Sequence, residues 1–500
     1  MNSFKNNIDS LIAALTGFVL ILLYTRHGGI GISPDSIVYT STARSIQEGK
    51  GLIQFDGTPM ILFPAAYPLF LSGIMAIMHV DVLQFAPYLN AILFGIVIYT
   101  SGCMMHKFKY HTNWYKWILL ACIICSPALL EIYFMLWSES LFVVWIMLFF
   151  LSIQYYFRTR STFAFVLFTL IASIAVVTRY AGVTVIGTGC LLLLFDKALQ
   201  WKKRLFNTAT FGIFSIVLLV LNIVRNNLVS GLVTGNRQKG IIPLHTNIEY
   251  LGSVLSDWLP LGSVSKTIAL IIGTIVLLLF IFIFIYRVVK NIHYYSYENI
   301  ATAFFIVYAL FMVISATISR YEPINSRLLS PLFISFIVGI SYKVPEWINA
   351  TNHKVFKWML SAGTILIVIA FLYKQINVDR NNYKDIDEGG IGGYTEDSWR
   401  ESPTISFLKN NPSLFKNDSL VVSNAGHAVY FYTGHQIKNI PERVHYEEVK
   451  NFYTKPYYYL IWFNNEGNVD LLNIDEIAAK KKMQRLQSFD DGAIFLCTNK

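Results

Sequence analysis

Long apolar runs follow one another through this chain from residue 8 to residue 373. Many approach the roughly 20 residues that an α-helix needs to cross the hydrocarbon core of a bilayer. Only 14% of the 500 residues are charged, against about a quarter in soluble proteins. The sequence therefore predicts a polytopic α-helical membrane protein with 11 to 13 transmembrane helices. The expected segments are 8–25, 66–80, 83–104, 117–136, 141–157, 163–178, 183–195, 206–224, 266–286, 298–316, 328–342 and 357–373.

The distribution of Lys and Arg predicts which ends of these segments face the cytoplasm. Cytoplasmic loops carry an excess of basic residues, and such residues cluster at 158–160, 197–204, 287–290 and 343–357. The other links, among them the loops 26–64 and 225–264, are then extracytoplasmic. A further basic cluster at 107–116 conflicts with this assignment if 66–104 crosses twice. Two alternatives stay open: 66–104 crosses once, with a tilted or re-entrant half-helix, or the cluster is an exception.

Residues 375–500 differ in composition from residues 1–374. The first part holds 26 Lys and Arg against 13 Asp and Glu, and the second holds 14 against 17. We expect a transmembrane module over 1–374, then a small extracytoplasmic α/β domain over 375–500, which is long enough for its own core. Glycines at 389–393 indicate a flexible stretch near their junction. The expected strands are 420–422, 457–462 and 493–497, and the expected helices are 427–432 and 474–486.

The net charge of +10 belongs to the membrane part of the chain. There it sets the orientation of the helices and meets anionic lipid head groups. Binding to nucleic acid requires a clustered basic face on a soluble domain, and the sequence contains no such cluster. Membrane lipids are thus expected partners and nucleic acid is not.

Asp35 occupies the most informative position in the chain. It lies in Ser33-Pro34-Asp35-Ser36, about ten residues after the first apolar segment. An acid where a membrane helix meets water is a candidate functional group. Pro34 at the first position of an expected helix over 35–47, with Ser33 as N-cap, also gives Asp35 a structural reading as a first-turn acid. Tyr39, one turn further along, is a candidate substrate-lining residue.

A second acid lies at another expected helix start. Glu139, in Trp137-Ser138-Glu139-Ser140, precedes the apolar run from Leu141. We interpret it as a second functional carboxylate, with the first-turn reading as the alternative. Glu131, one or two turns earlier, is more ambiguous.

Several arginines fall at the ends of apolar segments or in extracytoplasmic loops. Arginine binds phosphate oxygens in bidentate fashion and keeps its charge at any relevant pH. It also extends along lipid to reach head groups, and for Arg179 both interpretations stay open. The candidates for binding a donor phosphate are Arg179, Arg320, Arg327 and Arg237. The adjacent Tyr180 and Tyr321 are candidates for lining the substrate, as is His245, although a lone loop histidine is more often structural.

These motifs occur in an order that resembles a known family. Asp35 is followed by a tyrosine, by Ala-Arg, by Gly-x-Gly and by a Pro-Ala-Ala-Tyr-Pro-Leu motif at 64–69. Ser-Glu-Ser-Leu-Phe at 138–142, Thr-Arg-Tyr-Ala-Gly at 178–182 and Ser-Arg-Tyr at 319–321 with Arg327 come later. The ordered set resembles the GT-C superfamily of membrane glycosyltransferases, in its bacterial aminoarabinose-transferase-like and protein O-mannosyltransferase-like branch. The similarity extends from residue 1 to about residue 345.

The resemblance implies a GT-C-like fold, a polyprenyl-phosphate-linked sugar donor and Asp35 as the catalytic base, with Glu139 as the second acid. The protein mannosyltransferases carry Asp-Glu where this chain has Asp35-Ser36, which weakens the case for a protein acceptor. The acceptor (glycan, lipid or protein), the transferred hexose or pentose and the need for a divalent metal ion stay open.

The residue types agree with sugar transfer from a lipid phosphate. The phosphate leaving group is a weak base and needs no general acid, so one carboxylate that accepts the acceptor's proton is enough. Cations stabilise the negative charge that grows on the phosphate. A glycosidase would instead need two carboxyl groups around the scissile bond.

Two other classes of protein remain as alternatives. The first is a flippase or transporter of lipid-linked glycans, and the second is a membrane-anchored binding or scaffold protein whose activity lies in residues 375–500. Transporters often contain internal repeats and broken helices near the bilayer midplane. This sequence shows no repeat, and its charges cluster on loops, which favours the glycosyltransferase.

Overall fold

The computed structural model describes residues 7–109, 111–351, 353–415 and 419–500. The chain forms two compact units. The helical unit contains the residues up to Arg26, Ile61–Phe70 and Leu83–Asp385. The mixed unit contains His27–Met60, Leu71–Val82 and Ile386–Lys500.

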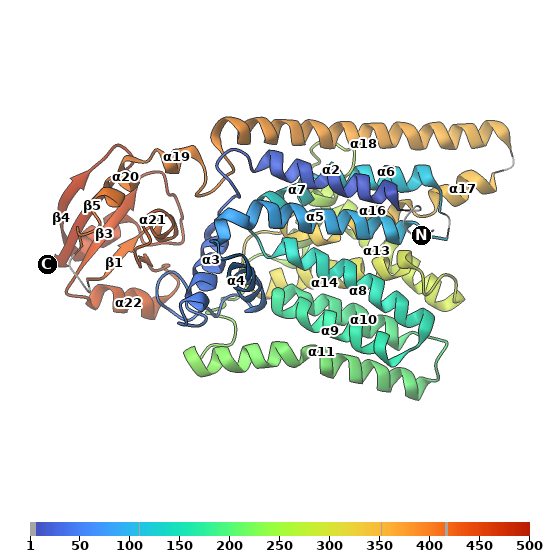
Figure 1. Cartoon of the computed structure of the whole chain (residues 1–500), viewed down its shortest axis with the longest axis horizontal. Helices are drawn as coiled ribbons and strands as arrows, with labels where there is room; N and C mark the ends of the chain where they lie inside the picture. Colours follow the sequence, from blue (N-terminus) through green and yellow to red (C-terminus); the bar gives the residue numbers. More distant parts are fainter. Residues whose placement is uncertain (1–6, 110, 352, 416–418) are drawn as a thin grey trace. The chain divides into compact units, whose positions relative to one another are not determined.

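The helical unit consists of helices joined by short links (Figure 1). Their bounds are α2 (Ile8–Tyr24), α5 (Val82–Met105), α6 (Asn113–Ile124), α7 (Pro127–Phe134), α8 (Glu139–Thr159), α9 (Thr162–Thr178), η1 (Tyr180–Gly182), α10 (Val183–Leu194), α11 (Trp201–Ser230), α12 (Leu244–Trp258), α13 (Lys266–Lys290), α14 (Tyr297–Ile318), α15 (Ser326–Leu329), η2 (Ser330–Leu332), α16 (Phe333–Ser341), α17 (Val344–Ala350) and α18 (Lys354–Gly389).

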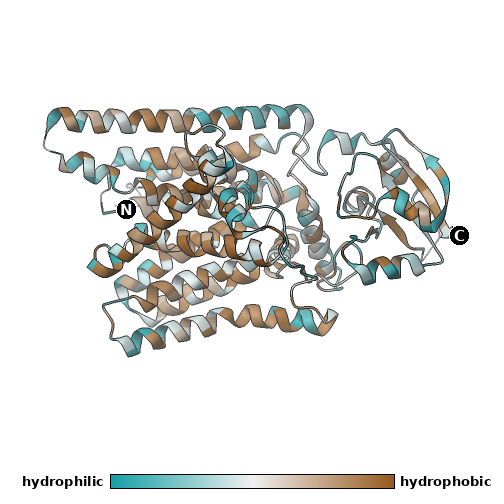
Figure 2. Ribbon diagram, turned by 180° about the vertical axis from the view of Figure 1, so that it is seen from behind, coloured by the Kyte–Doolittle hydropathy of each residue, from teal (hydrophilic) through white to brown (hydrophobic). Residues whose placement is uncertain are grey.

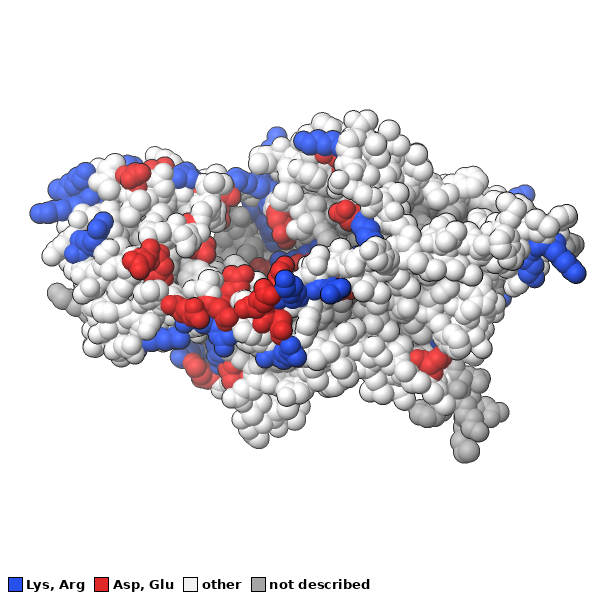
Figure 3. Space-filling model, turned by 90° about the horizontal axis from the view of Figure 1, so that it is seen from above, with Lys and Arg blue, Asp and Glu red and all other residues white. Residues whose placement is uncertain are grey.

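These helices confirm the expected polytopic membrane protein. Among the described residues, seven helical segments are long and apolar enough to cross a bilayer, and the bent pair α6–α7 makes eight. Adding the three longest of the shorter apolar helices gives eleven, the lower end of the expected number. Figure 2 shows apolar residues along these helices, and Figure 3 shows few charged side chains on the visible flank of the unit.

Helix α4 (Ala66–Met78) bears on the alternative left open for 66–104. Its 13 residues give a length of about 20 Å, against a hydrocarbon core of about 30 Å. Only α5 in this region has the length of a full crossing. A short α4 beside a full-length α5 fits the alternative of one crossing with a half-helix, and the number of crossings over 66–104 stays a prediction.

The loop expected over 225–264 is wrong in its bounds. Helix α11 continues to Ser230, and α12 occupies the second half of the loop. A Cβ atom on Gly252 would overlap the carbonyl of Ala269, and one on Gly273 would lie 2.6 Å from the carbonyl oxygen of Ile248. The backbones of α12 and α13 therefore approach closely through glycines, as is common for helices in membranes. Apolar residues also recur at helical spacing within α12, at Ile248, Leu251, Leu255 and Trp258, so the sequence contained a signal for this helix that the expected loop overlooked.

The mixed unit combines α3 (Pro34–Gln47) with a five-stranded sheet and short helices. The strand order is β2-β1-β3-β5-β4, where β1 is parallel to β2 and β3, and β5 is antiparallel to β3 and β4. The bounds are β1 (Val421–Ser423), β2 (Lys438–Asn439), β3 (Tyr457–Phe463), β4 (Lys481–Ser488), β5 (Gly492–Asn499), α19 (Asp397–Arg400), α20 (Pro403–Asn410), α21 (Gly426–Thr433), α22 (Tyr446–Thr454) and α23 (Ile474–Lys480).

The expected helix over 474–486 is wrong in its second half. Helix α23 ends at Lys480, and the next residues form the edge strand β4. Lys481 to Ser488 pair with β5 along its length, so the backbone ladder overrides the local helix preference of a Lys- and Gln-rich segment. The strands expected at 420–422, 457–462 and 493–497 and the helix at 427–432 are present within one or two residues.

Candidate functional site

Asp35 lies in the first turn of α3, as the sequence predicts. Pro34 is the first helical residue, and the backbone N–H of Ser33 donates to Ser36 Oγ at 3.1 Å. This capping box fixes the start of the helix. The following turns are buried, including Tyr39, whereas Asp35 is half-buried. A carboxylate here retains partial access to water and benefits from the helix dipole.

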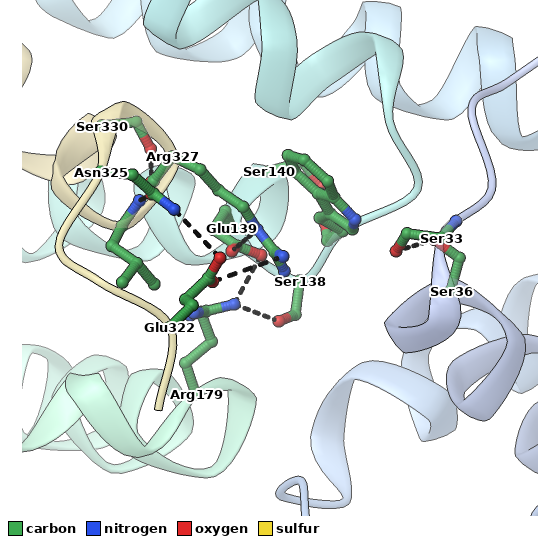
Figure 4. A network of polar contacts seen from close by, with 12 residues as sticks. Ser33, Ser36, Ser138, Glu139, Ser140, Arg179, Glu322, Asn325, Arg327 and Ser330 are labelled. Carbon is green, nitrogen blue, oxygen red and sulfur yellow. Dashed lines mark hydrogen bonds and ion pairs between the residues drawn. The ribbon is translucent and has the colours of Figure 1, made fainter. Parts of the chain in front are cut away.

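Glu139 lies at the centre of an ion-pair network in the helical unit (Figure 4). It is the first residue of α8 and only 1% exposed. Its Oε1 accepts from Arg327 Nε at 2.8 Å, and its Oε2 lies 2.5 Å from Arg179 Nη1. The second contact is an ion pair without hydrogen-bond alignment. The structure thus brings together three residues, Glu139, Arg179 and Arg327, that are far apart in the sequence.

Neighbouring side chains hold the two guanidinium groups of this network in place. Arg179 Nη1 also donates to Ser138 Oγ at 3.0 Å. The Arg327 guanidinium lies 3.8 Å from the centre of the Trp137 ring, a cation–π contact. Arg327 Nη1 also lies 3.8 Å from Glu322 Oε1. The side chains of Arg179 and Arg327 remain 18% and 15% exposed, so neither is fully buried.

A second polar cluster in the helical unit surrounds Tyr180. Its hydroxyl lies 3.5 Å from the side-chain nitrogens of Asn222 and Asn226, both on α11. Arg237 donates through Nε to the Thr234 carbonyl at 3.0 Å and through Nη2 to the Leu62 carbonyl at 3.5 Å. Burial lowers the pKa of this guanidinium from its usual value, and the nearby Tyr180 opposes that effect. These two acceptors are neutral, so they leave the positive charge of Arg237 available to an anion.

Arg320 and Tyr321 connect to the same loop. Residue Lys239 forms a β-bridge with Ser319, and Arg320 Nη1 donates to Gln238 Oε1 at 3.3 Å. The Tyr321 hydroxyl lies 2.8 Å from Ser315 Oγ. Burial raises the pKa of Tyr321, and the Ser315 hydrogen bond and the charge of Arg237 oppose the rise. Arg320 and Tyr321 therefore belong with Arg237 rather than with Glu139.

His245 does not join either cluster in the described contacts. It is the second residue of α12 and is exposed. Across the described ranges, no three His, Cys, Asp or Glu side chains are grouped closely enough to hold a metal ion.

Two contributors to the Glu139 network were missed in the sequence, namely Trp137 and Glu322. Trp137 and Ser138 directly precede Glu139, and Glu322 and Asn325 precede Arg327. Asn325 Nδ2 donates to Glu322 Oε2 at 3.0 Å and its Oδ1 caps α15. Their proximity in sequence to Glu139 and Arg327 was the available signal, but only the fold brings the two segments together.

The sequence matches no protein-family model and no curated protein sequence. Solved structures do resemble the fold. ArnT from Cupriavidus metallidurans, solved with bound undecaprenyl phosphate, is 10% identical with a TM-score of 0.59, and the match covers 98% of this chain and 97% of that chain.

Two further solved proteins show the same likeness. The oligosaccharyltransferase AglB from Archaeoglobus fulgidus, in complex with an inhibitory peptide and a dolichol-phosphate, is 11% identical, with a TM-score of 0.51 over 91% of this chain and 69% of AglB. The arabinofuranosyltransferase AftD from Mycobacteria is 12% identical, with a TM-score of 0.50 over 98% of this chain and 41% of AftD. The chain has the fold of the GT-C glycosyltransferases, which confirms the fold expected from the ordered motifs.

Proposed function

We propose that this GT-C-fold protein transfers a sugar from a polyprenyl-phosphate donor to an acceptor hydroxyl at the outer face of the cytoplasmic membrane. The observation that carries the proposal is a half-buried carboxylate, Asp35, at a capped helix start in a chain that matches a lipid-phosphate-bound glycosyltransferase over nearly its whole length. ArnT was solved with undecaprenyl phosphate and AglB with a dolichol-phosphate, which supports the class of donor.

Asp35 acts as the base in this proposal. Its carboxylate accepts the proton of the acceptor hydroxyl while the hydroxyl oxygen forms a bond to the anomeric carbon. The bond between that carbon and the phosphate oxygen breaks, and the electron pair leaves on the polyprenyl phosphate. A base that contributes in this way accelerates a reaction by about 10²- to 10⁴-fold. Because one displacement occurs, the anomeric configuration is inverted.

Glu139 is a positioning residue in the same proposal. Both of its oxygens face guanidinium groups and it is 1% exposed, so it is poorly placed to accept a proton from a substrate. It holds Arg179 and Arg327 in one orientation. Two guanidinium groups held side by side present a concentrated positive charge, which a donor phosphate can meet with charge-assisted hydrogen bonds.

Arg237 and Arg320 supply further positive charge for the donor phosphate. The known acceptors of Arg237 are carbonyl groups, so a phosphate would be its first strong anionic partner among the described contacts. Charge-assisted hydrogen bonds from arginine to phosphate are roughly twice as strong as neutral ones. Tyr180 and Tyr321, which lie near Arg237, would line the same region.

The charge distribution supports an active site on the extracytoplasmic side. Helix α8 begins at Glu139 and carries Arg158 in its last turn, and α9 runs back to Arg179. Glu139 and Arg179 therefore lie at the ends of their helices opposite to a basic, cytoplasm-typical link. In this proposal 66–104 crosses the membrane once, so the loop that carries Asp35 and the helix end that carries Glu139 face the same side.

The test of the proposal uses the full chain in lipid vesicles. The vesicles are incubated with a panel of polyprenyl-phosphate hexoses and pentoses and with lipid, glycan and peptide acceptors, and the products are identified by mass spectrometry. A product whose mass equals acceptor plus sugar, with free polyprenyl phosphate released, supports the proposal. Movement of intact donor across the vesicle membrane with no such product would instead identify a transporter.

A further inference from the structure

Two segments of the mixed unit that lie more than 360 residues apart in sequence meet just before Asp35. The backbone N–H of Tyr394 donates to the carbonyl of Ile32 at 2.8 Å. His27 Nε2 lies 3.0 Å from Asp397 Oδ2. The segment that leads into α3 is thus held at both of its ends by residues 394–397, just after α18.

Two glycines allow residues 394–397 to approach the segment before α3 this closely. Gly393 has φ +107°, and a Cβ atom there would overlap the carbonyl oxygen of Ile32. Gly28 on the facing segment has φ +79°, and its Cβ atom would lie 3.2 Å from the carbonyl oxygen of Thr395. Both positions combine a left-handed backbone with a close approach, which together favour glycine. The glycines at 389–393, expected to form a flexible stretch, instead include a tightly packed turn.

The position of Ile32 links this turn to the proposed base. Ile32 is buried and directly precedes Ser33, the N-cap of α3, so Asp35 follows it by three residues. The capping box between Ser33 and Ser36 ties the residue after Ile32 to the first turn of the helix. We therefore expect a displacement of the Ile32 carbonyl to shift the Asp35 backbone as well.

The segment after α3 has a second anchor on the same domain. Phe55 is 5% exposed, and its ring lies 4.4 Å from that of His427 between centroids. Gln436 Nε2 donates to the Asp56 carbonyl at 2.8 Å. The C-terminal domain thus holds the loop both before and after the helix that carries Asp35.

We propose that the turn Gly393–Asp397 is a positioning element that sets the location of Asp35 for catalysis. This inference rests on the proposed function, because it assigns a role relative to the base. It also gives the C-terminal domain a specific role, since its first turn fixes the backbone at Ile32 and its α21 region fixes the loop at Phe55 and Asp56. In this proposal the effect acts through the backbone at Ile32, which accepts the hydrogen bond from Tyr394.

The test compares Gly393→Ala with Gly389→Ala. A Cβ atom on Gly389 meets no atom within 4 Å, so this matched control adds the same methyl group four residues earlier without a clash. The probe is the polyprenyl-phosphate sugar that gives the highest turnover in the donor panel. Because a displacement of about 1 Å can cost a catalytic group about 10²-fold, we expect Gly393→Ala to lower kcat by about 10- to 100-fold. The KM for the donor should stay within about twofold of the unmodified protein.

Hydrogen–deuterium exchange supplies a readout that does not depend on activity. Gly393→Ala should increase exchange in the peptides covering 28–36 and 392–397, whereas Gly389→Ala should not. A second pair of variants, which should disturb the fold less, keeps the test informative if Gly393→Ala does not fold. Asp397→Ala removes the His27 contact and should lower kcat several-fold. Ser398→Ala, which removes an exposed hydroxyl that donates to Glu396 Oε2 at 3.3 Å, should leave kcat unchanged.

The outcomes separate this inference from the proposed function. If Gly393→Ala and Gly389→Ala have the same kcat, or if exchange rises without any change in kcat, the turn does not position the base. Asp35→Asn is measured in the same assay. If Asp35→Asn retains full activity, the base assignment fails whatever the glycine variants do, whereas an inactive Asp35→Asn beside an unaffected Gly393→Ala overturns only the positioning role.

Discussion

The two units handle buried ionisable groups in opposite ways. In the helical unit, Glu139 is buried as part of a charged network with two arginines. In the mixed unit, the His427 ring lies 4.4 Å from that of Phe55 between centroids, and its Nδ1 accepts a hydrogen bond from Asn439 Nδ2 at 3.3 Å. Burial lowers its pKa to about 4, and the charge of Asp56 opposes this only in part. Charge is compensated in the first case and avoided in the second, so the two units should respond to different perturbations.

The largest expected effect is that of replacing Asp35. Its carboxylate is half-buried, so it differs from the fully buried carboxylate of Glu139 and from the ring of His427, whose pKa is lowered by burial. Asp35→Asn should reduce sugar transfer by about 10³-fold, since an amide cannot accept the acceptor's proton and general base catalysis contributes about 10²- to 10⁴-fold. Transfer is measured with the donor identified in the panel. Glu48→Gln, at the exposed end of the same helix, is the matched control and should retain activity. Equal rates for both variants would remove Asp35 from the mechanism.

Loss of the buried charge in the helical unit should chiefly affect stability. Glu139→Gln leaves Arg179 and Arg327 without their shared carboxylate, and breaking a buried ion pair costs about 3–5 kcal/mol. Thermal unfolding in detergent or nanodiscs measures this loss of stability. Glu322→Gln removes a 45% exposed carboxylate 3.8 Å from the same Arg327 and should cost about 0–1 kcal/mol. Similar losses of stability for the two variants would contradict the view that Glu139 is the main partner of the two arginines.

Acid should destabilise the mixed unit through His427. The unfolded side chain gains a proton below about pH 6.5, whereas the folded one does so only near pH 4, so stability falls as pH drops through this window. The full difference corresponds to at most about 3 kcal/mol. His427→Gln should flatten the pH dependence of unfolding, and His435→Gln should leave it unchanged. A profile that His427→Gln does not alter would show that the histidine is not buried in its neutral form.

The smallest expected effect concerns the donor phosphate. Arg237→Gln should weaken binding of undecaprenyl phosphate by at least about tenfold, because a hydrogen bond to a charged group contributes about 1.5–3 kcal/mol. Lys239→Gln removes an exposed charge two residues away and serves as the control. The measurement is the affinity of the lipid for each variant in nanodiscs. Equal losses of affinity in the two variants would mean that general positive charge, rather than the Arg237 guanidinium, attracts the lipid.

The helical unit was largely predictable because its signal is local. Apolar runs mark the helices whatever their partners, and all twelve expected segments contain helices in the structure. The capped start of α3 was also readable, since Ser33, Pro34 and Asp35 are neighbours in sequence. Strand β4 was not, because pairing with β5 decides its conformation. Helix α12 was overlooked although its apolar residues recur at helical spacing.

The candidate site was predictable residue by residue but not as a geometry. Glu139, Arg179 and Arg327 were each singled out, yet no local pattern indicates that one carboxylate lies between both guanidinium groups. The grouping of Arg320 with the Arg237 loop rather than with Arg327 was equally inaccessible. Likewise, the contact of Tyr394 with Ile32 joins residues that only the folded mixed unit brings together.

The most direct test of the account is the anomeric configuration of the transferred sugar. A single turnover with an isotopically labelled polyprenyl-phosphate sugar of known configuration is followed by nuclear magnetic resonance of the glycosylated acceptor. One base and one displacement predict complete inversion, with polyprenyl phosphate released in equal amount. Retention of configuration, or release of free sugar in place of a glycosylated acceptor, would contradict the account.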